Sequence, residues 1–498
     1  MPGTAFQPSG REPTLRTTIE KAAETYGVAT WGSGYFDINR KGNLVVKPSE
    51  TDDGVDLKEV VDDLVKRGLQ APLLIRFPQI LANQVRRLNR AFKGAIKEFD
   101  YDGHHRAVFP MKVNPRREVL EEFLREGSRH DYGLECGSKA ELYAALSMPQ
   151  SGDGLLLCNG FKDAAFMEMA LMGRLVGKNV VITLEKLSEL RTAVEVAKQL
   201  GVRPAFGIRA KLYSKGSGKW EESGGETAKF GLTTSEMLEV LRFLEARDML
   251  DTLKVLHFHI GSQITDIKRI KNAMKEAARV YCKIRQKGIQ IEYLNVGGGM
   301  AVDYDGSRTS YESSANYSMQ EFANDVIFTI KSVCEDEDVP VPNLITESGR
   351  IMSAYHAMLV VKVTEEIETY VERVTPLEVD DDSPTVVAEL YGLYKSINAK
   401  NYREYYHDAQ EHKEELFTMF NLGLITLEDR ALGEALFWEV AAKALKFAQQ
   451  AKYVPEEFEE VKSVLAARYL CNFSVFRSVP DHWAIEQLFP ILPIHKLK

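Results

Sequence analysis

A lysine that closes one apolar run and three glycines that close another are the residues of this sequence whose types first suggest chemistry. Lys112 ends the run Val-Phe-Pro-Met-Lys (108–112), just before an Asn-Pro helix start, and Gly297, Gly298 and Gly299 follow Leu-Asn-Val (294–296). A lysine amine forms imines with carbonyl groups, and the backbone amides of a glycine turn bind anions. Pyridoxal 5'-phosphate (PLP), which carries an aldehyde and a phosphate, would use both features. Each feature alone is more often a surface lysine or a plain turn.

The elements that must position these residues alternate between strands and helices. Apolar runs of strand length occur at 106–112, 133–136, 154–158, 179–184, 204–209, 254–260, 291–296 and 343–347. Helical spacing separates most of them, at 115–127, 138–147, 162–173, 186–200, 234–249, 265–288 and 318–337. Eight such units predict an α/β fold whose parallel sheet closes into a (β/α)8 TIM barrel. A doubly wound open sheet is the alternative, because alternation does not prove closure.

Polar residues recur where the predicted strands end. From the first strand to the eighth they are Lys112, Glu135, Asn159, Glu185, His259, Ser262, Gly297, Gly298, Gly299, Glu347, Ser348, Gly349 and Arg350. In a TIM barrel the chemistry lies at the carboxyl ends of the strands. One polar residue there means little, but the repetition at one rim predicts an active site.

Composition limits the class of protein. With 498 residues, 44% apolar and 27% charged, the chain predicts a soluble globular protein of at least two domains. The net charge of -9 argues against a nucleic-acid partner, and no apolar run reaches membrane-spanning length or forms a signal peptide. The five cysteines are scattered without metal-type spacing, which predicts buried, reduced thiols in a cytoplasmic protein.

The order of patterns predicts five parts. Residues 1–70 form an N-terminal extension that contributes strands to a second β domain, including a hairpin over 35–39 and 42–46. The PLP-binding barrel spans 71–350, and further β-domain strands span 351–377. An acidic linker and a helical insertion occupy 378–465. The stretch 466–498 returns to the β domain with a strand-like character, and the domain is predicted to be truncated there.

The motifs resemble one family, the biosynthetic arginine decarboxylases, which are PLP enzymes with the alanine-racemase-like fold. The matching segments are 110–114 (PMKVN), 133–142 (GLECGSKAEL), 158–163 (CNGFKD), 216–220 (GSGKW), 229–232 (KFGL), 257–263 (HFHIGSQ), 295–299 (NVGGG), 346–350 (TESGR) and 472–476 (NFSVF). They are collinear and cover the chain from about residue 26 to its end, most weakly in the helical insertion.

The resemblance implies roles for particular residues. Lys112 would carry PLP as an imine, which requires burial to lower the lysine's pKa. His259 would stack on the pyridine ring, where the alternative is a packed strand histidine. Glu347 would face the pyridine nitrogen and keep it protonated, where the alternative is an ion pair with Arg350. The phosphate would be held by Ser262, Gly297, Gly298, Gly299, Gly349 and Arg350. The implied substrate-binding stretch is Leu294, Asn295, Val296, Gly297, Gly298, Gly299, Met300, Ala301, Val302, Asp303 and Tyr304. A flexible loop at 217–229 would cover the site.

The implied reaction is decarboxylation of L-arginine to agmatine and CO2 in polyamine (spermidine and putrescine) biosynthesis. The family is also associated with Mg2+, although the sequence offers no ligand cluster, and with homo-oligomers built from dimers. The family's Asp-x-Thr-Cys-Asp-Ser-Asp-Gly motif, which reads the guanidinium group across the dimer, is absent from the sequence. The chain is therefore expected to be a fragment, a subunit with a separate C-terminal polypeptide or a truncated product. Alone, it is expected to bind PLP but to decarboxylate arginine weakly or not at all.

Two alternatives remain open from the sequence. One is another barrel-type PLP enzyme, such as a diaminopimelate decarboxylase or an amino-acid racemase. The other is a PLP-binding but inactive regulatory chain, an alternative that the absent terminal motif leaves open.

Overall fold

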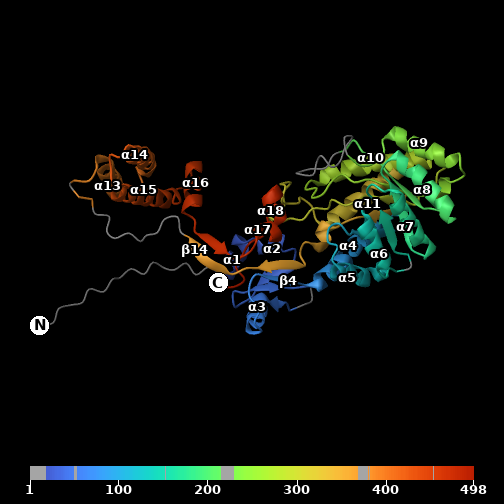
Figure 1. The fold of residues 1–498 in the computed structure, drawn as a ribbon, viewed down its shortest axis with the longest axis horizontal. Helices are drawn as coiled ribbons and strands as arrows, with labels where there is room; N and C mark the ends of the chain where they lie inside the picture. The colour runs from blue at the N-terminus through green and yellow to red at the C-terminus, as the bar shows by residue number, and fades with distance from the viewer. Residues whose placement is uncertain are drawn as a thin grey trace. The chain divides into compact units, whose positions relative to one another are not determined.

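A computed structural model describes residues 18–49, 53–151, 153–214, 229–367, 379–380, 382–451 and 454–498. The predicted cover loop at 217–229 lies outside these residues except for Lys229. The chain divides into two compact units (Figure 1). Unit 1 comprises Met1–Val360 and Ser474–Lys498, and unit 2 comprises Val361–Phe473.

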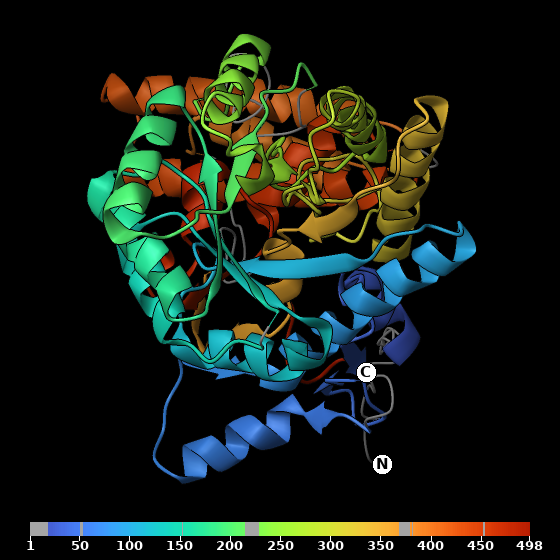
Figure 2. The ribbon, with the colours of Figure 1, turned by 90° about the vertical axis from the view of Figure 1, so that its right-hand side faces the viewer.

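Unit 1 is built around a closed barrel of eight parallel strands (Figure 2). The strands are β5 (His105–Pro110), β6 (Gly133–Cys136), β7 (Leu155–Cys158), β8 (Asn179–Leu184), β9 (Phe206–Arg209), β10 (Leu253–His257), β11 (Tyr293–Asn295) and β12 (Asn343–Thr346). The ring closes where β12 pairs with β5, with Leu344 opposite His105. The TIM barrel is thereby confirmed, and the open sheet is excluded.

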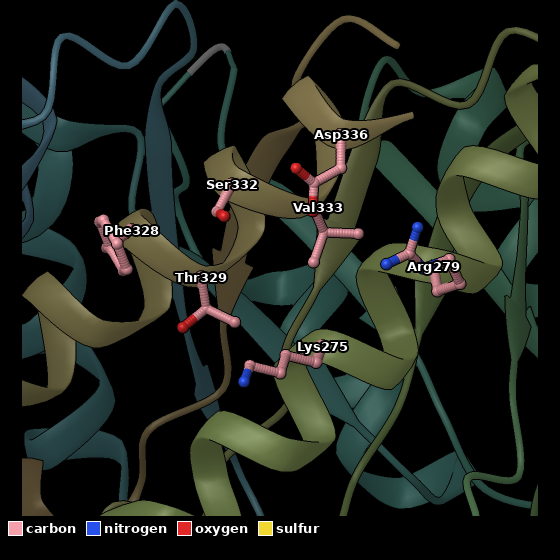
Figure 3. A pocket seen from close by; sticks show the side chains of 7 residues that line it. All are labelled: Lys275, Arg279, Phe328, Thr329, Ser332, Val333 and Asp336. Carbon is pink, nitrogen blue, oxygen red and sulfur yellow. The ribbon is translucent and has the colours of Figure 1, made fainter. Parts of the chain in front are cut away.

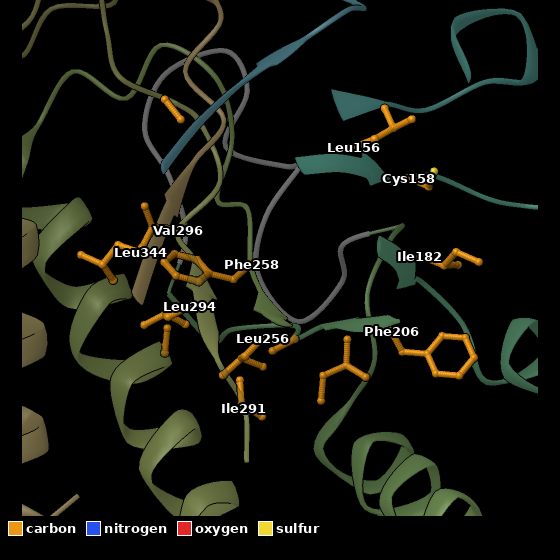
Figure 4. Packing of buried hydrophobic residues seen from close by; sticks show 14 of the residues in the cluster. Leu156, Cys158, Ile182, Phe206, Leu256, Phe258, Ile291, Leu294, Val296 and Leu344 are labelled. Carbon is orange, nitrogen blue, oxygen red and sulfur yellow. The ribbon is translucent and has the colours of Figure 1, made fainter. Parts of the chain in front are cut away.

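The two-residue period of the strands explains why they are apolar runs. Side chains on one side meet inside the barrel, where Val108, Leu157, Val181, Val255 and Ile345 belong to one buried cluster. Side chains on the other side pack against the surrounding helices; those labelled in Figure 4 are Leu156, Cys158, Ile182, Phe206, Leu256, Phe258, Ile291, Leu294, Val296 and Leu344. Strands buried on both faces need apolar residues at nearly every position.

Helices enclose the barrel, and all but the first of them, which precedes its strands, lie in the positions predicted between the strands. They are α4 (Pro78–Glu98), α5 (Arg117–Gly127), α6 (Lys139–Ser147), α7 (Ala164–Leu175), α8 (Leu187–Leu200), α9 (Thr234–Glu245), α10 (Ile267–Arg285) and α11 (Met319–Asp336). The capping box at the start of α9 is present, with Thr233 and Glu236 satisfying each other's backbone amides. Local signals thus fix the helix starts.

The rest of unit 1 contains small antiparallel pairings. The strands β1 (Phe36–Ile38), β2 (Leu44–Val46) and β3 (Val55–Asp56) form one sheet, which confirms the predicted hairpin. The strands β4 (Leu73–Arg76) and β13 (Ala357–Val360) form another. Short helices α1 (Ile19–Thr25), α2 (Val28–Trp31), α3 (Leu57–Lys66) and α12 (Arg350–Ser353) accompany them.

The end of the chain corrects one expectation. Residues 475–485 form the helices α17 (Val475–Ser478) and α18 (Pro480–Ile485) instead of strand, because Ser474 caps the first and Pro480 starts the second. Beyond them, the Leu44 amide donates to the Ile494 carbonyl at 3.0 Å, so the tail joins the edge of the hairpin.

Unit 2 has its own core. Its helices are α13 (Thr385–Ser396), α14 (Tyr402–Asn421), α15 (Leu427–Ala448) and α16 (Glu456–Leu465), and the strand pair β14 (Val363–Ile367) and β15 (Arg468–Cys471) joins its two ends. The helices bury Val387, Leu390, Leu416, Val440 and Phe458 together. Among the described residues of both units, no helix is long and apolar enough to cross a membrane.

Candidate active site

The barrel interior changes from apolar to polar toward the carboxyl ends of its strands. On β10, Val255 lies in the apolar interior, and His257 follows two residues later on the same side. The corresponding polar residues are Glu135 on β6, Asn159 directly after β7 and Glu347 directly after β12. All four polar residues are buried. The rim predicted from the sequence is therefore a layer of buried polar groups above an apolar floor.

Glu347 is the centre of this layer. Its Oε1 accepts hydrogen bonds from Asn159 Nδ2 at 3.0 Å and Asn295 Nδ2 at 2.6 Å, and His257 Nδ1 lies 3.3 Å away, without the alignment of a hydrogen bond. Burial alone would raise the pKa of Glu347, but His257 and the two amides lower it to about 2. Glu347 is therefore a buried carboxylate. The alternative of an ion pair with Arg350 is not found among the described contacts.

His259 lies beside Glu347 at the mouth and is partly exposed. The densely packed surroundings lower the pKa of His259 to about 3, and Arg209 adds to the effect. The Gly298 amide donates to His259 Nδ1 at 3.4 Å, which requires that nitrogen to be unprotonated. His259 is therefore a neutral aromatic ring held against the glycine turn.

The glycine turn is tightly enclosed. Gly297 and Gly299 have φ of +67° and +105°, which other residues rarely adopt. A Cβ on Gly298 would lie 2.5 Å from the Glu347 carbonyl oxygen. The Gly297 amide donates a hydrogen bond to Asn295 Oδ1 at 2.9 Å. Asn295 therefore connects the glycine turn to Glu347, to which its Nδ2 donates.

Three polar side chains from distant segments meet at another part of the mouth. Arg350 Nε donates to Ser262 Oγ at 3.4 Å, and its Nη1 donates to the Tyr304 hydroxyl at 3.3 Å. Gly349 precedes Arg350, and a Cβ there would lie 2.5 Å from Val113 beside Lys112. The structure thus brings the residues predicted to hold a phosphate close to one another and to the Lys112 turn.

The position of Lys112 differs from expectation. Lys112 follows β5 in the turn after Pro110, and its charge contributes to the lowered pKa of His259, so the two side chains are near each other. The residue is exposed. The expected burial of Lys112 is therefore wrong for the described structure, because the lysine stands past the strand end, above the buried layer.

The predicted substrate-binding stretch is divided by the wall of the barrel. The side chains of Leu294, Val296 and Met300 pack in the core between barrel and helices. Ala301 and Val302 are also buried, and their amides bind Tyr317 and Gln263. Asp303 accepts a hydrogen bond from Ser314. Of this stretch, Asn295, the three glycines and Tyr304 reach the other predicted site residues.

Sequence reasoning missed Arg209 and gave no role to His257. Arg209 ends β9, and its Nη1 lies 3.3 Å from both carboxylate oxygens of Glu185, the residue that follows β8. Behind it, Lys162 and Glu189 form an ion pair at 3.3 Å with both side chains fully buried. The strand-end rule would have found Arg209, since it is the polar residue that ends the fifth predicted strand.

The sulfur atoms and the metal-binding groups lie elsewhere. Four cysteines are buried and Cys471 is partly exposed, and all five are free thiols. One group of side chains in the described ranges could hold a metal ion: Glu389, His412 and Glu415 in unit 2, which are at least partly exposed.

A surface groove of about 320 Å³ lies between α10 and α11, where Lys275, Arg279, Phe328 and Asp336 line it (Figure 3). None of the predicted site residues lines this groove.

The comparisons with known proteins agree with this geometry. Residues 85–354 match the family described as "Pyridoxal-dependent decarboxylase, pyridoxal binding domain", and residues 380–462 match the "Arginine decarboxylase helical bundle domain". The barrel is thus that of a pyridoxal-dependent decarboxylase. The biosynthetic arginine decarboxylase of Deinococcus radiodurans is 46% identical over 100% of this chain and 76% of that protein. That of Phocaeicola vulgatus is 45% identical over 96% and 76%.

A solved structure gives the same result. The crystal structure of the biosynthetic arginine decarboxylase from Campylobacter jejuni matches with a TM-score of 0.83 and 34% identity, covering 95% of this chain and 74% of that one. The chain belongs to the biosynthetic arginine decarboxylases, as the sequence motifs predict.

The residues of the barrel mouth fit the PLP that this family implies. Within the described residues, Ser348 Oγ and Asn159 Oδ1 are buried without a hydrogen-bond partner, as expected of atoms next to a polar ligand. The turn at Gly297, Gly298 and Gly299 offers close backbone approach, and a buried carboxylate and a neutral ring lie beside it. A phosphate, a pyridine nitrogen and a flat ring each have a matching group here.

Proposed function

We propose that this protein decarboxylates L-arginine to agmatine and CO2, as a step of polyamine biosynthesis. The bond from the α-carbon to the carboxylate carbon breaks, CO2 leaves, and a proton takes its place. The observation that carries the proposal is the buried Glu347 carboxylate beside the glycine turn, in a chain whose relatives are named biosynthetic arginine decarboxylases. The match of residues 380–462 to the arginine decarboxylase helical bundle disfavours diaminopimelate decarboxylase and racemase.

PLP, when bound, supplies an electron sink for the negative charge that departing CO2 leaves behind. In this proposal Lys112 is the residue that carries the cofactor. Glu347 would hold a proton on the pyridine nitrogen, for which its lowered pKa is suited. His259 would stack on the ring. Ser262, Arg350 and the amides from Gly297 to Gly299 would hold the phosphate.

A neutral His259 suits this role. An imidazolium beside a protonated pyridine ring would oppose the charge that Glu347 stabilises, whereas the neutral ring contributes only stacking. The lowered pKa of His259, caused by its packed surroundings and Arg209, keeps it neutral throughout the physiological range.

The proposal extends to the organisation of the protein. Segments 1–70, 351–377 and 466–498 would build the second β domain, supported by the hydrogen bond between the hairpin and the tail. The strand β13 pairs with β4 (Leu73–Arg76), which lies just beyond residue 70. The oligomer of dimers, the separate C-terminal polypeptide and the cytoplasmic location stay predictions.

A magnesium requirement stays a prediction from the resemblance alone. The described group Glu389, His412 and Glu415 includes an imidazole, whereas Mg2+ prefers oxygen ligands, so these residues do not fit that ion. Dialysis against EDTA with restoration by Mg2+ measures the requirement directly.

The proposed function is tested with the purified protein supplied with PLP. Agmatine and CO2 are measured with L-arginine, and in parallel with L-ornithine, L-lysine and meso-diaminopimelate. Release of CO2 from arginine above the other three is expected. Bound PLP with no turnover of arginine would favour an inactive chain, and preference for diaminopimelate would replace the proposed substrate.

A further inference from the structure

His257 occupies a position in the barrel that its family motif does not explain. It ends β10 between two polar neighbours in register, with Arg209 opposite on β9 and Asn295 opposite on β11. Its side chain is 2% exposed, and its Nδ1 lies 3.3 Å from Glu347 Oε1. Arg209 is already paired with Glu185. Of these two basic side chains, His257 is therefore the one that approaches Glu347.

All the contacts of the Glu347 side chain in the described part of the chain end on one oxygen. Asn295 and His257 approach Oε1 from β11 and β10, and Asn159 approaches it from the end of β7; none of the described residues makes a hydrogen bond to Oε2. Glu347 keeps 8% of its surface exposed, and Oε2 is not among the fully buried polar atoms. One oxygen is therefore held by the protein, and the other opens toward the mouth.

We infer that His257 is a positioning residue that keeps Glu347 ionised and turns its free oxygen, Oε2, toward the cofactor's ring nitrogen. The inference rests on the proposed function and adds a residue that does not touch the ring itself. An Nδ1–H at 3.3 Å attracts the Oε1 charge even without the alignment of a hydrogen bond, whereas a lone pair on Nδ1 would repel it. Fixing the acceptor before the reaction is how preorganised sites gain rate.

A purely structural role does not account for the residue. Val255 lies two positions earlier on the same side of β10 and fills the interior with apolar atoms alone. A buried imidazole is costly without a polar partner, and within the described residues Glu347 is the group that its Nδ1 approaches. The other titratable groups around Glu347 are Glu135 and His259; neither is a donor to Oε1.

The test compares two substitutions in the PLP-loaded protein. His257→Leu keeps a bulky side chain and removes the donor, whereas His257→Asn places a neutral N–H near the position of Nδ1. His356→Asn is the matched control, because His356 is also buried (4% exposed) and its Nδ1 contacts the Ser353 carbonyl. Each variant is loaded with PLP that carries 15N in the pyridine ring, and its PLP content, ring-nitrogen chemical shift, kcat and KM are measured.

We expect His257→Leu to bind PLP but to shift the ring nitrogen toward its unprotonated value, with kcat lowered about 10- to 100-fold and KM little changed. Removing a side chain that orients a metal-binding residue typically costs about 10- to 100-fold, and we expect a similar loss for a side chain that orients a cofactor-binding residue. His257→Asn should lie between His257→Leu and the unmodified protein in both readouts, because its amide keeps a donor near Oε1 but does not fill the space of the imidazole ring. His356→Asn should match the unmodified protein.

The inference is overturned if His257→Leu holds PLP with an unchanged ring-nitrogen shift and a kcat within about threefold of the unmodified protein (less than 1 kcal/mol). If His257→Leu does not fold, His257→Asn decides, and an unmodified shift and kcat there overturn it. The proposed function fails separately. An unmodified protein that binds PLP but makes no agmatine overturns the reaction, while the ring-nitrogen comparison still decides the role of His257.

Discussion

Replacing Glu347 with glutamine separates its charge from its shape. Glutamine keeps an oxygen where Oε1 accepts from Asn159 at 3.0 Å and from Asn295 at 2.6 Å, so those two bonds survive. The change falls on Oε2, which is replaced by an amide NH2 group that cannot hold a proton on the pyridine nitrogen. A hydrogen bond to a charged group contributes about 1.5–3 kcal/mol, which corresponds to a fall in kcat of about 10- to 150-fold.

The same substitution has a pH signature in stability. Burial would raise the pKa of Glu347, but His257, Asn159 and Asn295 lower it from 4.5 to about 2. A carboxylate with a lowered pKa stabilises the folded protein above pH about 4.5, and this contribution is lost as the pH falls toward 2. The difference in melting temperature between Glu347→Gln and the unmodified protein should therefore narrow below pH about 4.5.

The assay for Glu347→Gln is agmatine release at saturating arginine, normalised to PLP content. Glu118→Gln is the control, since Glu118 is exposed in the first turn of α5. Near-normal turnover by fully loaded Glu347→Gln would show that another group faces the ring nitrogen. Loss of PLP together with activity would place Glu347 in cofactor binding, against the reasoning above.

Three further predictions test other parts of the site. Borohydride reduction should link PLP to the peptide containing Lys112 and should do so equally in Lys139→Ala; trapping on another lysine contradicts the assignment. Gly298→Ala should weaken PLP binding about tenfold or more, because its Cβ would lie 2.5 Å from a backbone oxygen and overpacking costs about 1–3 kcal/mol. Gly392→Ala, where a Cβ meets open space, should leave PLP affinity unchanged, and equal affinity in both variants would refute the cradle. Glu135→Gln should raise the melting temperature at pH 7, because burial and then Glu347 raise the pKa of Glu135 and the folded protein must keep a proton that the unfolded chain releases. That gain should fade as the pH falls to about 4.5, and a lower melting temperature at pH 7 would contradict it.

The barrel was predictable because its strands are buried on both faces. The runs around Leu134, Leu156 and Ile182 stand out from the polar helices between them, and the structure places β6, β7 and β8 within a residue or so of the predicted bounds. Closure was not predictable from the pattern. It depends on Leu344 pairing opposite His105, a contact between ends of the barrel that no local spacing encodes.

The site was predictable where one rule sufficed. The strand-end rule indicated Glu135, Asn159, Glu185 and Glu347, which all lie in the polar layer. It could not indicate which oxygen of Glu347 is held, because Asn159, His257 and Asn295 come from three strands. The burial of Lys112 was predicted wrongly, since exposure depends on what lies above the strand ends.

Two glutamates of one layer show how the barrel sets opposite charge states. Glu135 and Glu347 are each 8% exposed, and the charge of Glu347 opposes the ionisation of Glu135. Burial raises the pKa of Glu135 well above its ordinary value, and no hydrogen bond reaches its side chain within the described residues. Glu347 experiences the same burial, but Asn159, Asn295 and His257 converge on it and lower its pKa to about 2. Depth in the barrel therefore does not decide which of the two is the anion. The groups that converge from β7, β10 and β11 decide it, and they make Glu347 the carboxylate suited to a protonated ring.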